Sequence, residues 1–155
     1  MKKTTLAVMV QDDKIFLWRK KQWMAQWVYN GIGWKLEWEE SIEQCMIREA
    51  KEEIGVQVLE NDLEKVWIMR FYFKDTPHYD TEVHVFMIKK FVWNIIESDE
   101  IEPQWFDLWN IPYDKMWEAD SIWLPKVLNW ESWLLFTWYF DKDNGKLSKF
   151  IEGLE

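Results

Sequence analysis

Three glutamates close together near the middle of the chain place the strongest constraint on its fold. They stand in the stretch Arg48 to Val56, which reads REAKEEIGV. The segment begins with Ser41-x-x-Gln44, a pattern in which a hydroxyl and an amide each satisfy a free backbone N–H at a helix start. Gly55 suits the left-handed residue that ends many helices. The sequence therefore predicts a helix over Ser41 to Glu53.

The predicted helix collects negative charge on one side. Glu49, Glu52 and Glu53 are spaced i, i+3 and i+4, which directs all three carboxylates to one face. Like charges at this spacing weaken a helix, and a divalent cation would offset the repulsion. Hard cations such as Mg²⁺ prefer carboxylate oxygens and keep positions open for phosphates. Arg48 is placed to orient one glutamate by a bidentate contact. Taken alone, however, the spacing is also common on solvated acidic helix faces.

Alternating apolar residues outside this helix predict a sheet. Thr4 to Val10 and Ile15 to Trp18 flank the turn-like Asp12-Asp13 and predict a hairpin, and Arg19 to Ile32 is predicted to be a loop. The other predicted strands are Trp67 to Phe73, Val83 to Lys89, Gln104 to Leu108, Leu134 to Phe140 and Leu147 to Ile151.

A second helix is predicted over Ser121 to Asn129, where Pro125 is well tolerated only in the first turn. Asp141 to Gly145 is a strong hairpin signal between the last two strands. The chain shows no internal repeat or linker, so we expect a single α+β domain spanning 1–155, with a mixed sheet and two helices.

The composition limits the possible partners and location. A formal charge of −9 argues against a general nucleic-acid binder, but it allows a nucleotide substrate if acidic side chains hold the phosphate-facing metal ions. No apolar run is long enough to span a membrane, and no signal-peptide region follows Lys2-Lys3. A lone cysteine, Cys45, fits a reducing compartment. We predict a cytoplasmic monomer whose partner is a small molecule rather than a membrane or a nucleic-acid polymer.

The glutamates belong to a longer pattern that resembles the Nudix box. Trp34 is followed after five residues by Glu40, and after seven more by the Arg48 to Val56 stretch. Every defined position matches in kind except two: Trp34 stands for the first glycine, and Ala50 is small for an aliphatic position. A pattern of this length is far more specific than a short motif. The resemblance implies a Nudix fold, in which a mixed sheet is sandwiched between helices, and Mg²⁺-dependent hydrolysis, with Mn²⁺ as an alternative ion.

The likeness extends over most of the chain to the oxidised purine nucleoside triphosphate hydrolases, the 8-oxo-dGTP diphosphatase branch that sanitises the nucleotide pool. It rests on Tyr29 to Gly33, Glu97 to Glu100, Trp105-Phe106 and Met116 to Trp123. The implied metal ligands are the Gly33 carbonyl, Glu49, Glu52, Glu53 and Glu100, while Glu40 supports the box. The implied substrate residues are Asn30, Trp117, Asp120, Thr5 and Lys20.

The chemistry of these residues agrees with those roles. Trp117 offers a flat face for purine stacking, and Asn30 and Asp120 can read a base edge. The alternative for Trp117 is an ordinary core or surface aromatic. Ala119 stands where mammalian members carry an acidic residue beside the next aspartate. Two adjacent carboxyls can share a proton and so read an altered purine edge flexibly, whereas a single carboxyl cannot do this in the same way. The sequence therefore does not establish whether the protein prefers oxidised purines.

The chain is rich in tryptophan and poor in glycine. It has 14 Trp and 5 Gly, whereas glycine averages about 7%. Several tryptophans stand where the chain geometry favours glycine: Trp23, Trp27, Trp34, Trp38 and Trp130. One hypothesis is that these are UGA codons read as glycine in the source organism; the alternative is a naturally Trp-rich protein. UGG codons at positions 34 and 38 would exclude the first explanation.

Three functions are compatible with these features. The leading prediction is hydrolysis of purine nucleoside triphosphates to monophosphate and pyrophosphate, with Glu52 or Glu53 as the general base and Glu49 supporting the metal. A second is hydrolysis of a dinucleoside polyphosphate, a nucleotide sugar or an isoprenoid diphosphate. A third is a catalytically impaired module that binds nucleotides. Metal-dependent release of pyrophosphate separates the third from the first two.

Overall fold

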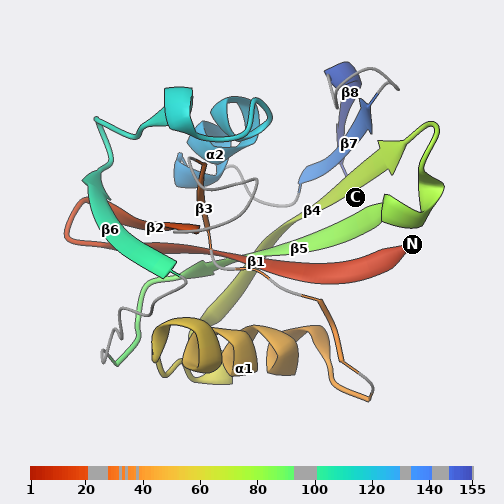
Figure 1. Cartoon of the computed structure of the whole chain (residues 1–155). Helices are drawn as coiled ribbons and strands as arrows, with labels where there is room; N and C mark the ends of the chain where they lie inside the picture. Colours follow the sequence, from red (N-terminus) through yellow and green to blue (C-terminus); the bar gives the residue numbers. More distant parts are fainter. Residues whose placement is uncertain are drawn as a thin grey trace.

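The fold is a mixed sheet with one helix on each face. The structure is a computed structural model that describes residues 1–20, 28–31, 33, 35–37, 39–92, 101–129, 134–140 and 147–154. The helices are α1 (Ile42–Ile54) and α2 (Asp120–Leu128). The strands are β1 (Lys2–Gln11), β2 (Lys14–Lys20), β3 (Tyr29–Asn30), β4 (Leu63–Phe73), β5 (Thr81–Ile88), β6 (Ile101–Asp107), β7 (Leu134–Phe140) and β8 (Leu147–Leu154). In Figure 1, α1 lies below the sheet and α2 above it.

The sheet combines antiparallel and parallel pairs. Its order is β3-β2-β1-β5-β4-β7-β8, and β6 pairs with the other side of β2. β1 runs parallel to β5, and β4 runs parallel to β7, while the other pairs are antiparallel. Strand alternation sends one set of side chains toward α1 and the other toward α2. The predicted α+β class, the mixed sheet and the two helices are therefore confirmed.

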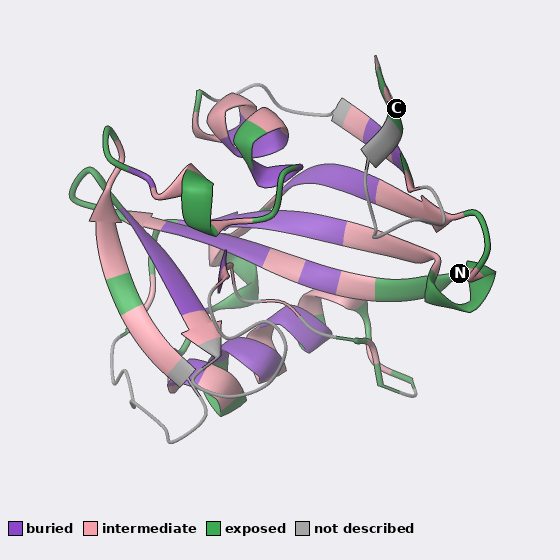
Figure 2. Ribbon diagram, turned by 45° about the horizontal axis from the view of Figure 1, so that its top comes forward, coloured by how far each residue is buried: buried purple, intermediate pink, exposed green. Residues whose placement is uncertain are grey.

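Each helix face buries its own hydrophobic cluster. The cluster on the α1 side includes Ala7, Met9, Met46 and Phe86, all fully buried. The cluster on the α2 side includes Val8 and Trp123. Figure 2 shows the buried residues concentrated in the central strands and on the sheet-facing sides of both helices. Burying apolar surface at about 25 cal/mol per Å² makes these two layers the main source of stability.

Local signals in the sequence predicted the ends of α1 correctly. Ser41 Oγ accepts from the Gln44 backbone N–H at 3.1 Å, and the Gln44 side chain accepts from the Ser41 N–H at 2.8 Å. Gly55 is left-handed, with φ 70°, and its N–H donates to the Lys51 carbonyl. The Asp12-Asp13 hairpin is also confirmed, and both residues have positive φ.

One prediction about local structure was wrong. The stretch from Arg19 to Ile32 is not all loop: β2 continues to Lys20, and β3 pairs with it through Trp18↔Asn30 and Arg19↔Tyr29. The sequence pattern did not show this pairing because β3 is only two residues long, too short for an alternating pattern to indicate a strand. Residues 21–27 and the 141–145 turn lie outside the described residues.

The predicted second helix is confirmed as α2, with both ends shifted by one residue, and Pro125 lies in its interior rather than in its first turn. A proline there removes one helical hydrogen bond. The helix continues past it because Trp123, Leu124 and Val127 are buried, and because the Asn129 N–H donates to the Pro125 carbonyl at 3.0 Å. Within the described residues, no helix is long and apolar enough to cross a membrane.

Candidate active site

β1 and β2 separate beyond their hairpin, and the opening that this leaves in the sheet is occupied by β3 and the chain that follows it. The two strands pair only beside their hairpin, from Met9↔Phe16 to Gln11↔Lys14. Farther along β2, the place of β1 is taken by β3. The chain then crosses to β1 again, where Lys35 forms a bridge with Thr4. The segment between β3 and α1 therefore passes from the α2 face to the α1 face through the opening.

Two glycines allow this close passage. A Cβ on Gly33 would stand 2.1 Å from the Thr5 carbonyl oxygen, and one on Gly31 would stand 2.7 Å from the Ala7 carbonyl oxygen. Neither site has room for a side chain, because real Cβ atoms essentially never approach to less than 3.0 Å. The Trp18 indole N–H donates to the Gly31 carbonyl at 2.9 Å and fixes the segment from the β2 side. The sequence analysis did not identify this role of Trp18.

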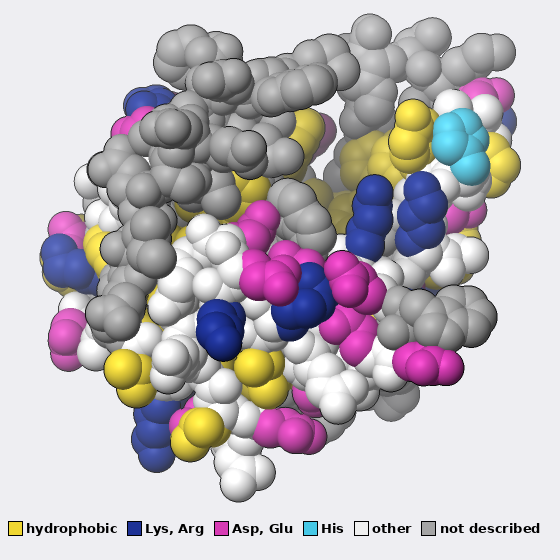
Figure 3. All heavy atoms as spheres, turned by 60° about the horizontal axis from the view of Figure 1, so that its bottom comes forward, with side chains coloured by type: hydrophobic (Ala, Val, Ile, Leu, Met, Phe, Trp, Pro, Cys, Tyr) yellow, Lys and Arg dark blue, Asp and Glu magenta, His cyan; other side chains and the backbone are white. Residues whose placement is uncertain are grey.

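Arg48 organises the carboxylates of α1. Its guanidinium makes a bidentate contact with Glu40, with Nε to Oε2 at 3.0 Å and Nη2 to Oε1 at 2.8 Å. It also pairs with Glu49, and with Glu52 at 3.0 Å. Figure 3 shows acidic side chains gathered around basic ones on this side of the molecule. Arg48 thus contacts glutamates of the box helix as predicted, but its bidentate contact is with Glu40, which precedes the helix.

The local environment changes the pKa values of this cluster. Hydrogen bonds from Arg48, opposed in part by burial, lower the pKa of Glu40 from 4.5 to about 2. The Glu37 N–H donates to Glu40 Oε1 at 2.6 Å, which ties the loop before the helix to the same carboxylate. Glu49 is buried, and this burial raises its pKa despite the arginine beside it. Glu52, by contrast, is exposed, and Glu53 is half-buried.

These glutamates are not drawn together into one site. Among the described residues, no group of three or more acidic, histidine or cysteine side chains is arranged to hold a metal ion. Glu100 and Trp34 lie outside the described residues, so their predicted places are not tested. The structure provides a set of hard oxygen donors on α1, the helix whose Cys45 thiol lies 3.6 Å from the Lys35 carbonyl and 3.8 Å from the Thr5 hydroxyl. One guanidinium faces four carboxylates there, those of Glu37, Glu40, Glu49 and Glu52.

A cavity of about 850 Å³ lies on the α2 face of the sheet. Its lining is largely apolar and includes the side chains of Leu6, Val8, Met69 and Phe71. It also contains the predicted substrate residues Asn30, Trp117 and Asp120, and it reaches Gly33 and Lys35 at the opening. The cavity therefore adjoins the opening between β1 and β2, and α1 lies on the other face of the sheet.

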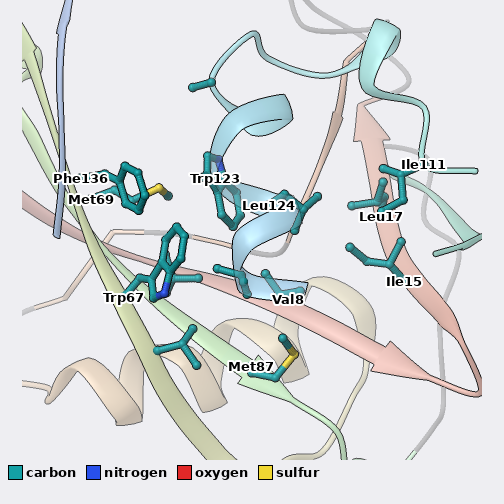
Figure 4. Close-up of a cluster of buried hydrophobic side chains, with 14 of the residues drawn as sticks. Val8, Ile15, Leu17, Trp67, Met69, Met87, Ile111, Trp123, Leu124 and Phe136 are labelled. Carbon is teal, nitrogen blue, oxygen red and sulfur yellow. The ribbon is translucent and has the colours of Figure 1, made fainter. Parts of the chain in front are cut away.

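Packing of α2 onto the sheet positions the polar end of this cavity. Trp123 and Leu124 point from α2 toward the sheet, where Trp67 and Val8 meet them (Figure 4). The Trp123 and Trp67 rings are 6.4 Å apart. The expected core position of Trp123 is confirmed, since its side chain is 4% exposed. This packing holds the first turn of α2, and Asp120 with it, against the cavity.

Asp120 and Asn30 are both fixed by tryptophans. The Trp123 indole N–H donates to Asp120 Oδ1 at 2.8 Å, and the Trp117 backbone N–H donates to Oδ2 at 3.1 Å. The Trp117 indole N–H donates to Asn30 Oδ1 at 2.8 Å. Burial raises the pKa of Asp120 to about 6, partly opposed by its two donors. The structure thus brings Asn30, Trp117 and Asp120 together, and their role in base recognition stays a prediction.

Two other predicted substrate residues are less directly placed. Thr5 borders the cavity, but its hydroxyl lies on the α1 side, 3.8 Å from Cys45 Sγ, because it shares the strand face of Ala7. For Lys20 the structure describes the backbone in β2 and not the side chain, so its role stays a prediction. Sequence reasoning did not find Phe71, Phe73 and Phe140 in the cavity wall. Strand alternation could have marked them as inward-facing, but not as lining a cavity.

An α+β sheet with a carboxylate helix on one face and a cavity of about 850 Å³ on the other is the arrangement expected of a Nudix domain. The sequence matches the NUDIX domain family over residues 1–127. It is 36% identical over 124 residues to the oxidized purine nucleoside triphosphate hydrolases of Danio rerio and Mus musculus, covering 80% of this chain and 78% of each relative. The mutator MutT protein of Bacillus halodurans has a similar structure, with a TM-score of 0.83, 20% identity, and 98% and 97% of the two chains covered. The chain belongs to the Nudix family.

Proposed function

We propose that the protein hydrolyses purine nucleoside triphosphates, oxidised ones included, to monophosphate and pyrophosphate with the help of Mg²⁺. The observation that carries this proposal is the cavity bounded by Asn30, Trp117 and Asp120, which reaches the opening at Gly33. The names of the relatives from Danio rerio and Mus musculus point to the same substrate class.

The cavity has the features that a purine requires. The Trp117 side chain is 55% exposed, which leaves an aromatic surface accessible to a ligand. Stacking of a base on an aromatic ring contributes about 1–3 kcal/mol in other nucleic-acid sites. Asn30 and Asp120 add polar groups at one end of a largely apolar lining, which is typical of a small-molecule site. The phosphate chain of a bound nucleotide would then lie beside Gly33, at the opening between β1 and β2.

The carboxylate oxygens of α1 suit a hard divalent cation. Carboxylate and carbonyl oxygens are the ligands that Mg²⁺ prefers. The single positive charge of Arg48 leaves the surrounding carboxylates with net negative charge, and a cation would balance it. Glu49, Glu52, Glu53, Glu100 and the Gly33 carbonyl would hold the ion. When bound, it would neutralise phosphate charge and make a water molecule more acidic.

The protein's own groups would then complete the reaction. Glu52 or Glu53 would accept the proton of the attacking water, and both remain candidates for this general base. Arg48 and Glu40 would keep the helix face in position without touching the substrate. Asn30, Trp117 and Asp120 would hold the base, so that the phosphates alone face the carboxylates.

The test is pyrophosphate release with Mg²⁺ from dGTP, 8-oxo-dGTP, 2-hydroxy-dATP and a dinucleoside polyphosphate. We expect turnover of a purine triphosphate and its loss in Glu53→Gln, whereas Glu60→Gln, an exposed glutamate away from the helix, should keep full activity. Activity seen only in Trp34→Gly would support a misread glycine codon. Turnover of the dinucleoside polyphosphate alone, or equal activity in the double variant Glu52→Gln/Glu53→Gln and the unchanged protein, would overturn the proposal.

A further inference from the structure

We infer that the C-terminal strand β8 takes part in nucleotide binding, although none of its described residues lines the cavity. Glu152 of β8 forms an ion pair with Lys126 of α2, and this pair positions α2 over the cavity. Both are positioning residues, because they act through the helix and not on the substrate. The inference rests on the proposed function and names a part of the chain on which its substrate affinity depends.

α2 crosses the sheet from one end of the strand order to the other. β3 and β8 are the terminal strands in this order. Just before the first turn of α2, the Trp117 indole N–H donates to Asn30 of β3 at 2.8 Å. In the last turn of α2, Lys126 Nζ donates to the two carboxylate oxygens of Glu152 at 2.7 Å and 2.8 Å. Polar contacts with two distant strands therefore hold the two ends of the helix.

The cavity lies between α2 and the central strands, so packing supports the helix only in part. The lining includes Trp123 and Leu124 from the helix, and Val8 and Met69 from the sheet. Pro125 removes a hydrogen bond from the interior of the helix. A helix with a cavity beneath it and a proline in its interior depends on its end contacts for its position.

Lys126 connects α2 to both strands of the C-terminal hairpin. Its Nζ lies 5.9 Å from the centre of the Phe136 ring, and Phe136 stands opposite Glu152 in the register of β7 and β8. Phe136 also pairs with Met69, which lines the cavity. The side chains of Lys126 and Glu152 are 29% and 34% exposed, so solvent screens the ion pair only in part. The pair thus lies close behind the cavity wall.

Loss of the ion pair should weaken nucleotide binding without changing the chemical step. The helix would keep its contact with Asn30 and could shift at its other end, which would widen the cavity. The carboxylates that would hold Mg²⁺ lie on α1, on the opposite face of the sheet (Figure 1). A partly exposed ion pair changes an equilibrium by about 2- to 5-fold. We therefore expect a higher KM and an unchanged kcat.

The experiment measures KM and kcat for dGTP with Mg²⁺ in four variants. Glu152→Gln keeps the shape of the side chain, removes its charge and should raise KM by about 2- to 5-fold. Glu152→Lys places two cations together and should raise KM further. The double variant Lys126→Glu/Glu152→Lys reverses the pair and should restore KM to within about 2-fold of the unchanged protein. Asp107→Asn is the matched control and should leave KM unchanged, because Asp107 pairs with Lys14 at 2.9 Å and neither residue lines the cavity.

High salt separates an electrostatic role of Glu152 from a packing role. A salt concentration of about 1 M reduces the Debye length to about 3 Å and weakens a partly exposed ion pair. The difference in KM between Glu152→Gln and the unchanged protein should therefore shrink as NaCl is added. A difference that is the same at low and high salt would mean that Glu152 acts through packing, and this would contradict the inference.

The outcomes separate this inference from the proposed function. If no nucleotide is hydrolysed, the proposed function fails, and equilibrium dialysis of dGTP without metal still compares the affinities of the same variants. Equal affinities would then overturn the inference as well. If dGTP is hydrolysed but KM is unchanged in Glu152→Gln and Glu152→Lys, or if the reversed pair does not restore KM, the inference is wrong while the proposed function holds. A lower kcat with an unchanged KM would also overturn it.

Discussion

Replacing Glu40 by glutamine should destabilise the fold by an amount that depends on pH. Glu40 is 13% exposed and pairs with Arg48 through two hydrogen bonds. On folding, its pKa falls from 4.5 to about 2. At 1.36 kcal/mol for each tenfold change, this corresponds to about 3 kcal/mol in favour of the folded, ionised state.

The direction of the pH effect follows from the lowered pKa. The stabilisation is complete above about pH 5 and is lost as the pH falls through 4.5 toward 2. Glu40→Gln should therefore lower the free energy of unfolding by about 3 kcal/mol at pH 7 and by about 2 kcal/mol at pH 3.5. Urea unfolding of the two proteins at both pH values measures this gap.

A matched control separates the ion pair from a general effect of losing an acid. Glu60→Gln removes an exposed glutamate from the turn before β4 and should change stability by less than about 0.5 kcal/mol at either pH. A gap for Glu40→Gln that is equally large at pH 7 and pH 3.5 would refute the reasoning. Such a result would mean that Glu40 acts through the backbone N–H of Glu37, which a glutamine oxygen can also accept.

Three further substitutions test the packing. Gly33→Ala would bring a Cβ within 2.1 Å of the Thr5 carbonyl and should cost about 1–3 kcal/mol in urea unfolding, with loss of hydrolysis, whereas Gly153→Ala, with nothing within 4 Å, should be nearly neutral. Glu39→Gly should raise the melting temperature by relieving a φ of 66° at an exposed position, a gain of about 0.5–1 kcal/mol. Met87→Ala, at 2% exposure, should lower the unfolding free energy by about 2–5 kcal/mol.

Local parts of the fold could be predicted from the sequence, and long-range pairings could not. The ends of α1 were predictable because Ser41, Gln44 and Gly55 act on neighbouring backbone groups. The pairing of β3 with β2, by contrast, is possible because β1 pairs with β2 only from Met9 onward, which no local pattern encodes. Pairing between distant segments is a property of the whole chain, so the opening in the sheet could not be predicted.

The same contrast between local and long-range features applies to the candidate site. Asp120 was identified through a resemblance, but its two N–H donors and its burial are properties of the packed α2 helix. Glu40 was identified through its place in the box, and its bidentate contact with Arg48 spans eight residues of loop and helix. Strand alternation places Thr5 on the same face as Ala7, but only the packed structure shows that this face is the one covered by α1. The sequence could thus indicate which residues belong to the candidate site, whereas the orientation of their side chains required the tertiary structure.

Two buried tryptophans offer a direct test of how the indole N–H contributes to stability. Trp123 donates to Asp120 at 2.8 Å, whereas the Trp138 nitrogen is buried and has no hydrogen-bond partner among the described residues. Both rings pack against aromatic neighbours, Trp138 against Phe136 and Phe150. Changing either residue to phenylalanine removes similar ring volume, at a cost of about 1 kcal/mol.

The polar contribution should differ in sign between the two sites. Trp138→Phe removes a buried donor whose desolvation costs about 1–3 kcal/mol, so its net effect should lie near zero or be stabilising. Trp123→Phe removes a charge-assisted bond and leaves Asp120 with one donor, which should destabilise by about 3 kcal/mol in total. Urea unfolding at pH 7.5 compares the two. Equal destabilisation would show that ring packing alone determines both positions, and that the orientation of Asp120 does not depend on the Trp123 indole.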